Sequence, residues 1–534
     1  MYDLFDTVIK NVKIIDGTGI PWFAGDVGIQ NGKIGFVGHI GEYRSVETID
    51  GDGRILCPGF IDIHTHCDFM FFSDPYALSR IMQGVTTVAI GQCGISPAPV
   101  TEEHVKMMGS YTSFIQGGAH PMWTWRSFAD WLSVLDSLRP GVNVFSYVGH
   151  GTIKLNVTGS ENRNPTGEEI AQMQDLLRSA LEEGAFGMSS GLIYPPGSFA
   201  SIEEIIAVAE PLREYNALYL SHVRNEASGL PDAVAEILLL AEQLHVPVQV
   251  HHLKSMGNQN WGLTGEVLDM MEEARKHGVD VTAEVYPYTA TSTTLRTMLP
   301  GWVREKGRKG IAEMLEDREI RDRIAREIKA NAHGEDRISS CGGPEGIVVL
   351  DTPETPELNG KNLAEASSIL GLDPIETVLE IIMHNRGEDA CCFFCLDEKE
   401  VASVLASPLV MVGSDSLLPA SGSTCHPRTY GTFPRILDKY VMKEGLLSIE
   451  EAVRKMTGFP AARAGLLSKG LVREGMDADL ILFDPAKIKE KASFAEPTNY
   501  AAGIDEMFIN GKRIISGGEP TGVRAGKVLR RGKR

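Results

Sequence analysis

Residues 58–66, Pro-Gly-Phe-Ile-Asp-Ile-His-Thr-His, decide the fold assignment, because an apolar run of strand length ends there in two histidines. Comparable apolar runs recur along the chain, and segments with helical periodicity separate many of them; Glu168–Glu183 is the clearest. Eight strands with intervening helices predict an α/β fold built on a (β/α)8 TIM-like barrel. The expected strands are Phe60–His66, Thr86–Gly91, Asn143–Val148, Ala185–Ser190, Leu218–His222, Val246–His252, Val281–Val285 and Leu409–Gly413.

The two ends of the chain have a different sequence pattern, which predicts short strands between glycine-rich turns. We expect residues 1–57 and 465–534 to pair into one small β-sandwich domain, and residues 58–464 to form the barrel. A long, charged stretch with helical periodicity around Gly310–Ala332 interrupts the alternation of strands and helices. It predicts an insertion at about 289–347, over the C-terminal face where barrel active sites lie.

Composition narrows the class of protein. The chain has 534 residues and a net charge of −20, which disfavours nucleic acid and anionic membranes as partners. No apolar stretch approaches the roughly 20 residues of a membrane helix, and the N-terminus does not resemble a signal peptide. Eight cysteines favour reduced thiols in a cytoplasmic protein. The oligomeric state is not readable from the sequence, and a monomer or small homo-oligomer is expected. The basic tail, Val523–Arg534, is expected to be solvated.

Several side chains able to bind a metal stand at the ends of the predicted strands. His64 and His66 lie two residues apart, so they point to the same face of their strand. The C-terminal ends of barrel strands share one rim, where these side chains would converge. Imidazole, thiolate and carboxylate ligands together suit zinc. The candidate ligands are His64, His66, Cys93, His222, His252 and Asp415.

Longer motifs run through nearly the whole chain in a consistent order. They include PGFIDIHTH, GVTTVAIGQCGISPAP, SHVRNEA, QVHHLKSMGNQNWG and VGSDS. In these motifs the chain resembles the amidohydrolase superfamily, and more narrowly the N-acyl-D-amino-acid deacylase (D-aminoacylase) family. The resemblance implies zinc-dependent hydrolysis of the amide bond of N-acyl-D-amino acids, which gives a carboxylate and a free D-amino acid.

The resemblance also implies how the ligands divide. One tightly bound zinc would use Cys93, His222 and His252, and a second, weaker position would use His64, His66 and Asp415. The adjacent histidines His251 and His252 compete for one role. The spacing to Lys254 and the strand alternation favour His252 without excluding His251. The family's Gly-Asn-Cys-Gly is Gly-Gln-Cys-Gly in this chain.

Other residues receive roles from the same reasoning. Asp415 is expected to act as general base and acid as well as ligand. Arg224, Glu226 and His150 are expected to position other side chains. Cys391–Cys395 is interpreted as a buried strand and not as a metal motif. The expected contacts to the small-molecule substrate are Tyr194, Lys254, Tyr286 and Arg428, with a bidentate carboxylate pair at the arginine.

Two alternatives accompany this interpretation. A related amidohydrolase could act on dipeptides with a D-residue or on cyclic amides, because the pocket shape is not readable from the sequence. A non-catalytic scaffold would be expected to have lost ligands, whereas all six candidates are present.

Overall fold

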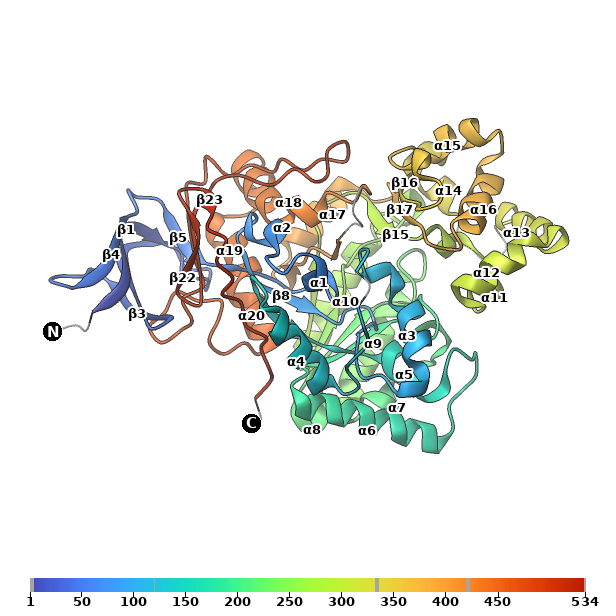
Figure 1. Ribbon diagram of the computed structural model, residues 1–534, viewed down its shortest axis with the longest axis horizontal. Helices are drawn as coiled ribbons and strands as arrows, with labels where there is room; N and C mark the ends of the chain where they lie inside the picture. The colour runs from blue at the N-terminus through green and yellow to red at the C-terminus, as the bar shows by residue number, and fades with distance from the viewer. Residues whose placement is uncertain (1–3, 120, 332–335, 419–422, 533–534) are drawn as a thin grey trace.

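The computed structural model describes residues 4–119, 121–331, 336–418 and 423–532. Its centre is a closed barrel of eight parallel strands, which confirms the predicted fold class (Figure 1). The first strand is interrupted after Asp62, and its second part closes the barrel by pairing Thr65 with Ser416. The barrel strands are β6 (Phe60–Asp62) with β7 (Thr65–His66), β8 (Val85–Ile90), β9 (Asn143–Ser146) with β10 (Val148–Gly149), β11 (Gly187–Gly191), β12 (Leu218–His222), β13 (Val248–Val250), β14 (Val281–Val285) and β18 (Val410–Val412) with β19 (Ser416–Leu417).

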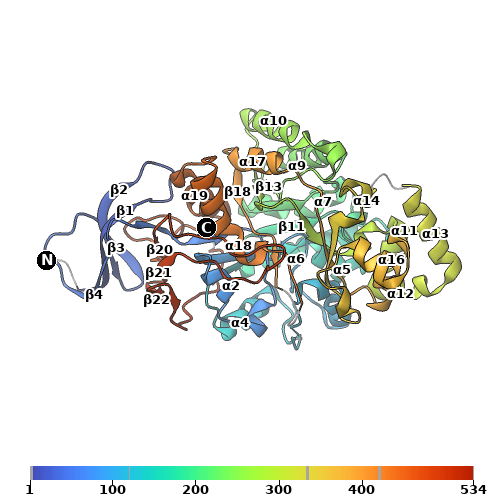
Figure 2. The same cartoon turned by 90° about the horizontal axis from the view of Figure 1, so that it is seen from above.

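Helices surround the barrel (Figures 1 and 2). In α6 (Gly167–Glu183), Thr166 and Glu169 form a capping box at the start, and Met173 and Leu177 are buried. The other helices outside the insertion are α1 (Met70–Ser73), α2 (Leu78–Ile81), α3 (Val105–Tyr111), α4 (Phe128–Leu138), α5 (His150–Thr158), α7 (Ile202–Ala209), α8 (Pro211–Tyr215), α9 (Leu230–Leu244), α10 (Leu263–Lys276), α17 (Glu398–Ala406), α18 (Arg428–Arg435), α19 (Ile449–Met456) and α20 (Gly458–Ala464).

The two chain ends meet in a small β-domain beside the barrel (Figure 1). Its strands from both ends share one apolar core and are linked by hydrogen bonds into one nine-stranded sheet. The antiparallel pairing of β5 with β20 joins the N-terminal strands to the C-terminal ones. The strands are β1 (Phe5–Ile14), β2 (Phe23–Gln30), β3 (Lys33–Gly38), β4 (Ser45–Asp50), β5 (Ile55–Pro58), β20 (Leu480–Phe483), β21 (Ile504–Ile509), β22 (Lys512–Ser516) and β23 (Glu519–Pro520).

The insertion after β14 extends further than the sequence indicates. It continues to Phe393 and has its own apolar core and a three-stranded sheet. The expected single helical stretch is two helices, because Asp317 caps the second one; Ala332 lies outside the described residues. Cys391 and Cys392 are buried in a strand, as expected. The elements are β15 (Thr291–Thr293), α11 (Gly301–Arg304), α12 (Gly307–Glu316), α13 (Arg318–Lys329), α14 (Arg337–Ser340), β16 (Ile347–Asp351), α15 (Leu363–Leu370), α16 (Pro374–His384) and β17 (Ala390–Phe393).

The described part of the basic tail is bound to the barrel, so the expectation of a solvated end is wrong. Val144 donates its N–H to Lys527 O at 2.9 Å, and Leu529 donates to Val144 O at 2.7 Å. Leu529 also packs on the apolar cluster that contains the inner strand residues. The charges of the tail find partners at the same time, since Arg530 pairs with Asp136 at 2.9 Å.

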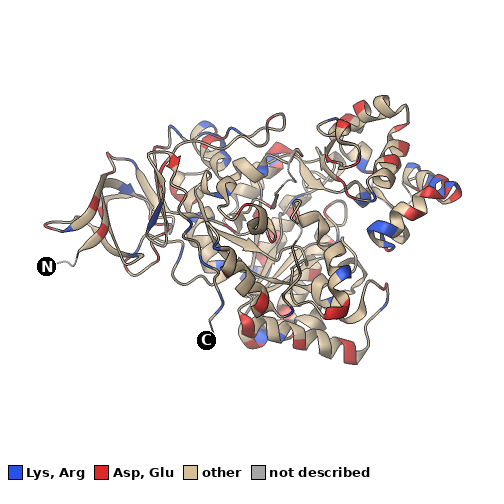
Figure 3. Cartoon of the chain, in the orientation of Figure 1, with Lys and Arg blue, Asp and Glu red and all other residues tan. Residues whose placement is uncertain are grey.

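Charged side chains are concentrated on the outer helices, and the insertion helices α12 and α13 carry both signs (Figure 3). Within the described residues, no helix combines the length and apolarity needed to cross a membrane.

Candidate active site

One cavity at the C-terminal ends of the barrel strands collects nearly all of the side chains singled out from the sequence. It is also lined by residues that no sequence motif indicates, among them Phe114, Met256 and Thr293. His64 lies behind the cavity wall and is fully buried. The predicted residues that line the cavity are His66, Cys93, Tyr194, His222, His252, Lys254, Tyr286, Asp415 and Arg428.

Cys93 lies at the centre of the site, in a sharp turn after β8. Its φ is +51°, and Gly91 and Gly94 on either side are also left-handed. A side chain at Gly94 would have its Cβ 2.6 Å from Gly191 N, so glycine is required there for the strands to approach. The turn brings the thiol out of the strand and into the cavity.

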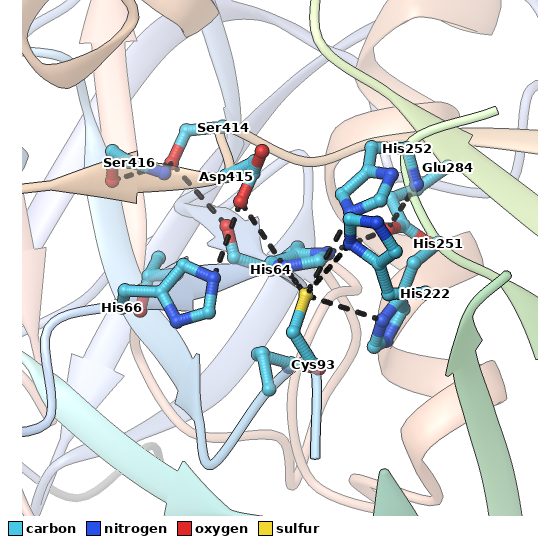
Figure 4. Close-up of polar contacts among 12 residues, drawn as sticks. His64, His66, Cys93, His222, His251, His252, Glu284, Ser414, Asp415 and Ser416 are labelled. Carbon is cyan, nitrogen blue, oxygen red and sulfur yellow. Dashed lines mark hydrogen bonds and ion pairs between the residues drawn. The ribbon is translucent and has the colours of Figure 1, made fainter. Parts of the chain in front are cut away.

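Four imidazoles surround the sulfur of Cys93 (Figure 4). The Sγ atom lies 3.5 Å from His64 Nε2, 3.7 Å from His222 Nδ1, 3.8 Å from His251 Nδ1 and 3.6 Å from His252 Nε2. A zinc ion with Zn–S of about 2.3 Å and Zn–N of about 2.1 Å in a tetrahedron separates its sulfur and nitrogen ligands by about 3.6 Å. The separation between the sulfur and each imidazole nitrogen therefore fits that of two ligands on one zinc ion.

The protonation states of the cluster also suit a cation. Burial lowers the pKa of His222 well below its usual range, and burial likewise lowers the pKa of His252, so both imidazoles are neutral and able to coordinate. Burial raises the pKa of the Cys93 thiol well above its usual range. A bound cation would reverse this, because a coordinating thiol loses its proton.

Asp415 faces the cluster from the last strand. Its Oδ1 lies 3.3 Å from both His64 Nε2 and His66 Nε2, and its Oδ2 lies 2.8 Å from a guanidinium nitrogen of Arg428. Burial alone would raise the pKa of Asp415, but Arg428 and His64 outweigh burial and hold the pKa well below its usual range. Asp415 is therefore a carboxylate in the protein, available both to a metal and to a proton.

Glu284 on β14 also belongs to the site, although no sequence motif indicated it. Its carboxylate contacts His64 Nδ1 at 2.6 Å and accepts the main-chain N–H of His252 at 2.8 Å. Burial raises the pKa of Glu284 to about 7. The available signal was a single acid in the apolar run Val281–Val285, since a buried carboxylate needs partners. A carboxylate on the far nitrogen of an imidazole fixes the ring orientation.

Glu226 links two of the candidate ligands to Lys254. One oxygen of Glu226 lies 3.0 Å from His252 Nδ1 and accepts a hydrogen bond from the Lys254 ammonium, and the other lies 3.7 Å from His222 Nε2. Glu226 thus contacts the far nitrogen of His252 and faces that of His222. Arg224 does not join the site, because it pairs with Glu236 at 3.0 Å.

His150, also expected to position site residues, belongs to a separate buried group. Its Nε2 lies 3.7 Å from Glu204, and Lys154 donates to the same carboxylate at 2.6 Å. Both side chains follow β10 on α5 and lie off the cavity.

The sequence model of the amidohydrolase family matches residues 47–515 of the chain. The chain belongs to the amidohydrolase family. It is similar to the D-aminoacylase of Alcaligenes xylosoxydans xylosoxydans, with 34% identity over 99% of this chain and 98% of the relative. The N-acyl-D-aspartate deacylase of the same organism is 34% identical over 98% of this chain and 95% of its own.

A solved structure extends the similarity to three dimensions. The N-acyl-D-glutamate deacylase of Bordetella bronchiseptica, crystallised with zinc and a phosphonate inhibitor, has a TM-score of 0.82 at 32% identity, and the match covers 99% of this chain and 100% of that one. The similarity therefore covers both the barrel and the β-domain.

The other predicted contacts of this amidohydrolase have partners within the protein. The Tyr194 hydroxyl lies 3.2 Å from the Thr293 hydroxyl of the insertion. The guanidinium carbon of Arg428 stands 4.8 Å from the ring centre of Tyr286, and the Lys254 ammonium stands 5.6 Å from the same centre. Two cations thus lie near the ring of one tyrosine, which directly follows β14.

Proposed function

We propose that this chain is a zinc-dependent N-acyl-D-amino-acid deacylase. The observation that carries the proposal is the convergence, in one cavity, of a thiol and several imidazoles at zinc-ligand spacing with two cations suited to a substrate carboxylate. The full-length similarity to deacylases of D-aminoacyl substrates supports the same reaction. The reaction cleaves a linear amide to a carboxylate and a free D-amino acid.

We propose that the ligands divide between two metal positions as the resemblance implies. Cys93, His222 and His252 would hold one zinc tightly, and His64, His66 and Asp415 would form a weaker second position. When bound, zinc supplies a water of lowered pKa and polarises the acyl carbonyl. Glu226 contacts the far nitrogen of His252, and Glu284 contacts the far nitrogen of His64. These contacts keep the other nitrogen of each ring turned toward the proposed metal positions.

Asp415 is the proton carrier in this proposal. As a carboxylate beside His64 and His66, it takes a proton from the attacking water. It then gives that proton to the amide nitrogen, which makes the amine a better leaving group. Arg428 favours the carboxylate form and so sets the group to begin as a base.

The substrate carboxylate would be bound beside Tyr286. Arg428 offers several donors, of which the pair with Asp415 engages only part, so it can hold a carboxylate as well. The Lys254 ammonium lies near the same ring. Both cations are already paired with acids, which lowers the cost of keeping them buried before substrate arrives.

Replacing Arg428 with Met is expected to raise KM for an N-acyl-D-amino acid by about 10- to 100-fold, because a charged hydrogen-bond partner of the substrate is lost. Steady-state kinetics with the zinc-loaded enzyme measures the change. Arg435→Met is the matched control, since Arg435 lies on the same helix and pairs with Glu490 at 2.7 Å. An unchanged KM in Arg428→Met would remove Arg428 from the substrate site.

The proposed activity is tested with purified, zinc-loaded protein and matched N-acetyl-D- and N-acetyl-L-amino acids. We expect release of free amino acid from the D-substrates only, with preferences among acidic, aromatic and aliphatic side chains found from the same panel. Activity on D-residue dipeptides or cyclic amides, with none on N-acyl-D-amino acids, would instead identify a related amidohydrolase.

We also propose that the enzyme works in the cytoplasm as a monomer or small homo-oligomer. The eight cysteines, all free thiols in the structure, support a reducing compartment. Size-exclusion chromatography with light scattering measures the oligomeric state.

A further inference from the structure

His251, the neighbour of the expected ligand His252, also faces the sulfur of Cys93 (Figure 4). Its Nδ1 lies 3.8 Å from Cys93 Sγ, and its ring centre lies 4.3 Å from that of His64. The side chain is 1% exposed and does not line the cavity. His251 therefore approaches the cluster from the side away from the substrate.

The backbone explains how two consecutive histidines reach one sulfur. Successive side chains on a strand point to opposite faces, so only one of the pair could face Cys93 in a regular strand. The strand β13 ends at Val250, and His252 has a φ of +31°. The chain is anchored just before this turn, because the His251 N–H donates to Ser221 O at 2.9 Å.

Two imidazoles of the cluster have acidic partners that account for their orientation. His64 is held by Glu284, and His252 by Glu226. The Nε2 atom of His251 has no hydrogen-bond partner among the described residues, although it is fully buried, and the same holds for Nε2 of His222, whose other nitrogen also faces the sulfur. A buried imidazole without such support is costly to keep, which calls for a compensating interaction at its other nitrogen.

We propose that His251 is a further zinc ligand, donating Nδ1 to the ion held by Cys93, His222 and His252. The inference rests on the zinc site of the proposed function and not on the identity of the substrate. The separation of 3.8 Å from the sulfur is close to the spacing of about 3.6 Å between ligands of one tetrahedral zinc. His251 and His252 would thus both coordinate the same zinc ion, so they do not compete for one ligand position.

The consequence is a zinc ion with four protein ligands in the resting enzyme. Sites of that kind hold zinc firmly, whereas catalytic sites keep a position for water. For water to bind such an ion, the ion would have to accept a fifth ligand or release one imidazole. Because His251 lies off the cavity, its nitrogen occupies the side of the ion that substrate does not need.

The experiment compares zinc affinity and coordination in three full-length variants loaded with one equivalent of metal. His251→Ala removes the ligand. His251→Asn keeps an N–H group near the position of Nδ1 but offers a poor zinc ligand. His277→Ala is the matched control, an exposed histidine at the C-terminal end of α10 that contacts Glu273.

Competition with a chromophoric chelator is expected to show zinc affinity reduced by roughly 10- to 100-fold in both His251 variants and unchanged in the control. Co²⁺ substitution and zinc X-ray absorption are expected to show one imidazole fewer than in the unmodified protein. Circular dichroism checks that each variant is folded.

Equal affinity and equal coordination in His251→Ala and the unmodified protein would overturn the proposal. Restoration by His251→Asn would also overturn it, because it would identify His251 as a hydrogen-bond donor to the thiolate. If the variants fail to fold, X-ray absorption of the unmodified protein with one zinc decides, since two imidazoles with the sulfur would contradict the proposal and three would support it. These measurements need no substrate, so they stand apart from a failure of the deacylase activity.

Discussion

Replacing Asp415 with Asn is expected to lower kcat on an N-acyl-D-amino acid by about 10²- to 10⁴-fold, the usual contribution of a positioned acid–base group. Asn fills the same space and keeps hydrogen-bonding contacts, but it can neither take the proton of water nor return it to the leaving nitrogen. The structure places the carboxylate between His64, His66 and Arg428, where its proton affinity is held low. Stopped assays on zinc-loaded enzyme measure the loss.

The Asp415→Asn result is interpretable only if zinc remains bound. Metal analysis should show that the tightly held ion, expected on Cys93, His222 and His252, is retained. Asp389→Asn is a suitable control, because Asp389 is also a buried aspartate near an arginine, Arg296, but lies in the insertion. A variant that kept both its zinc and more than half of its kcat would show that another group carries the proton.

Replacing Cys93 with Ser is expected to remove the tightly bound zinc and, with it, all measurable turnover. The thiolate is the only sulfur in the cluster, and a hydroxyl keeps its proton too firmly to replace it as a ligand. Elemental analysis should fall from about one zinc per chain to near none, as strong chelation of the unmodified protein would also produce.

The control for Cys93→Ser is Cys341→Ser, a partly buried cysteine of the insertion that is far from the imidazole cluster in sequence. It should keep both zinc and activity. Full zinc content in Cys93→Ser, measured after dialysis, would contradict the central position of the sulfur in the metal site.

The barrel could be predicted because its strands are buried on both faces and therefore appear as unbroken apolar runs. The extent of the insertion could not. Helices α15 and α16 have ordinary amphipathic periodicity, and only the packing of α16 with α12 and α13, and of α15 with α16, separates them from barrel helices. The tail was misjudged for a similar reason, since its charges are visible in the sequence but its backbone pairing with Val144 is not.

The site could be predicted where the chemistry lies at strand ends, because such residues converge on one rim whatever the details of packing. Glu284 was missed because it lies within a strand and acts through His64. Arg224 was expected near the cluster, but Glu236 on α9 provides a nearer partner. The strand alternation used to choose between His251 and His252 does not apply, because β13 ends before either residue.

The pairing of β5 with β20 has a consequence for the synthesis and folding of the protein. Pro58 finds its partner Leu480 only after roughly 420 further residues have been added. At about 5–20 residues per second, ribosomal synthesis leaves the edge of β5 open for roughly 20–80 s. The barrel can assemble during that interval, whereas the first domain to emerge is the last to be completed. Chaperones that shield strand edges should therefore matter most for the N-terminal segment of the nascent chain.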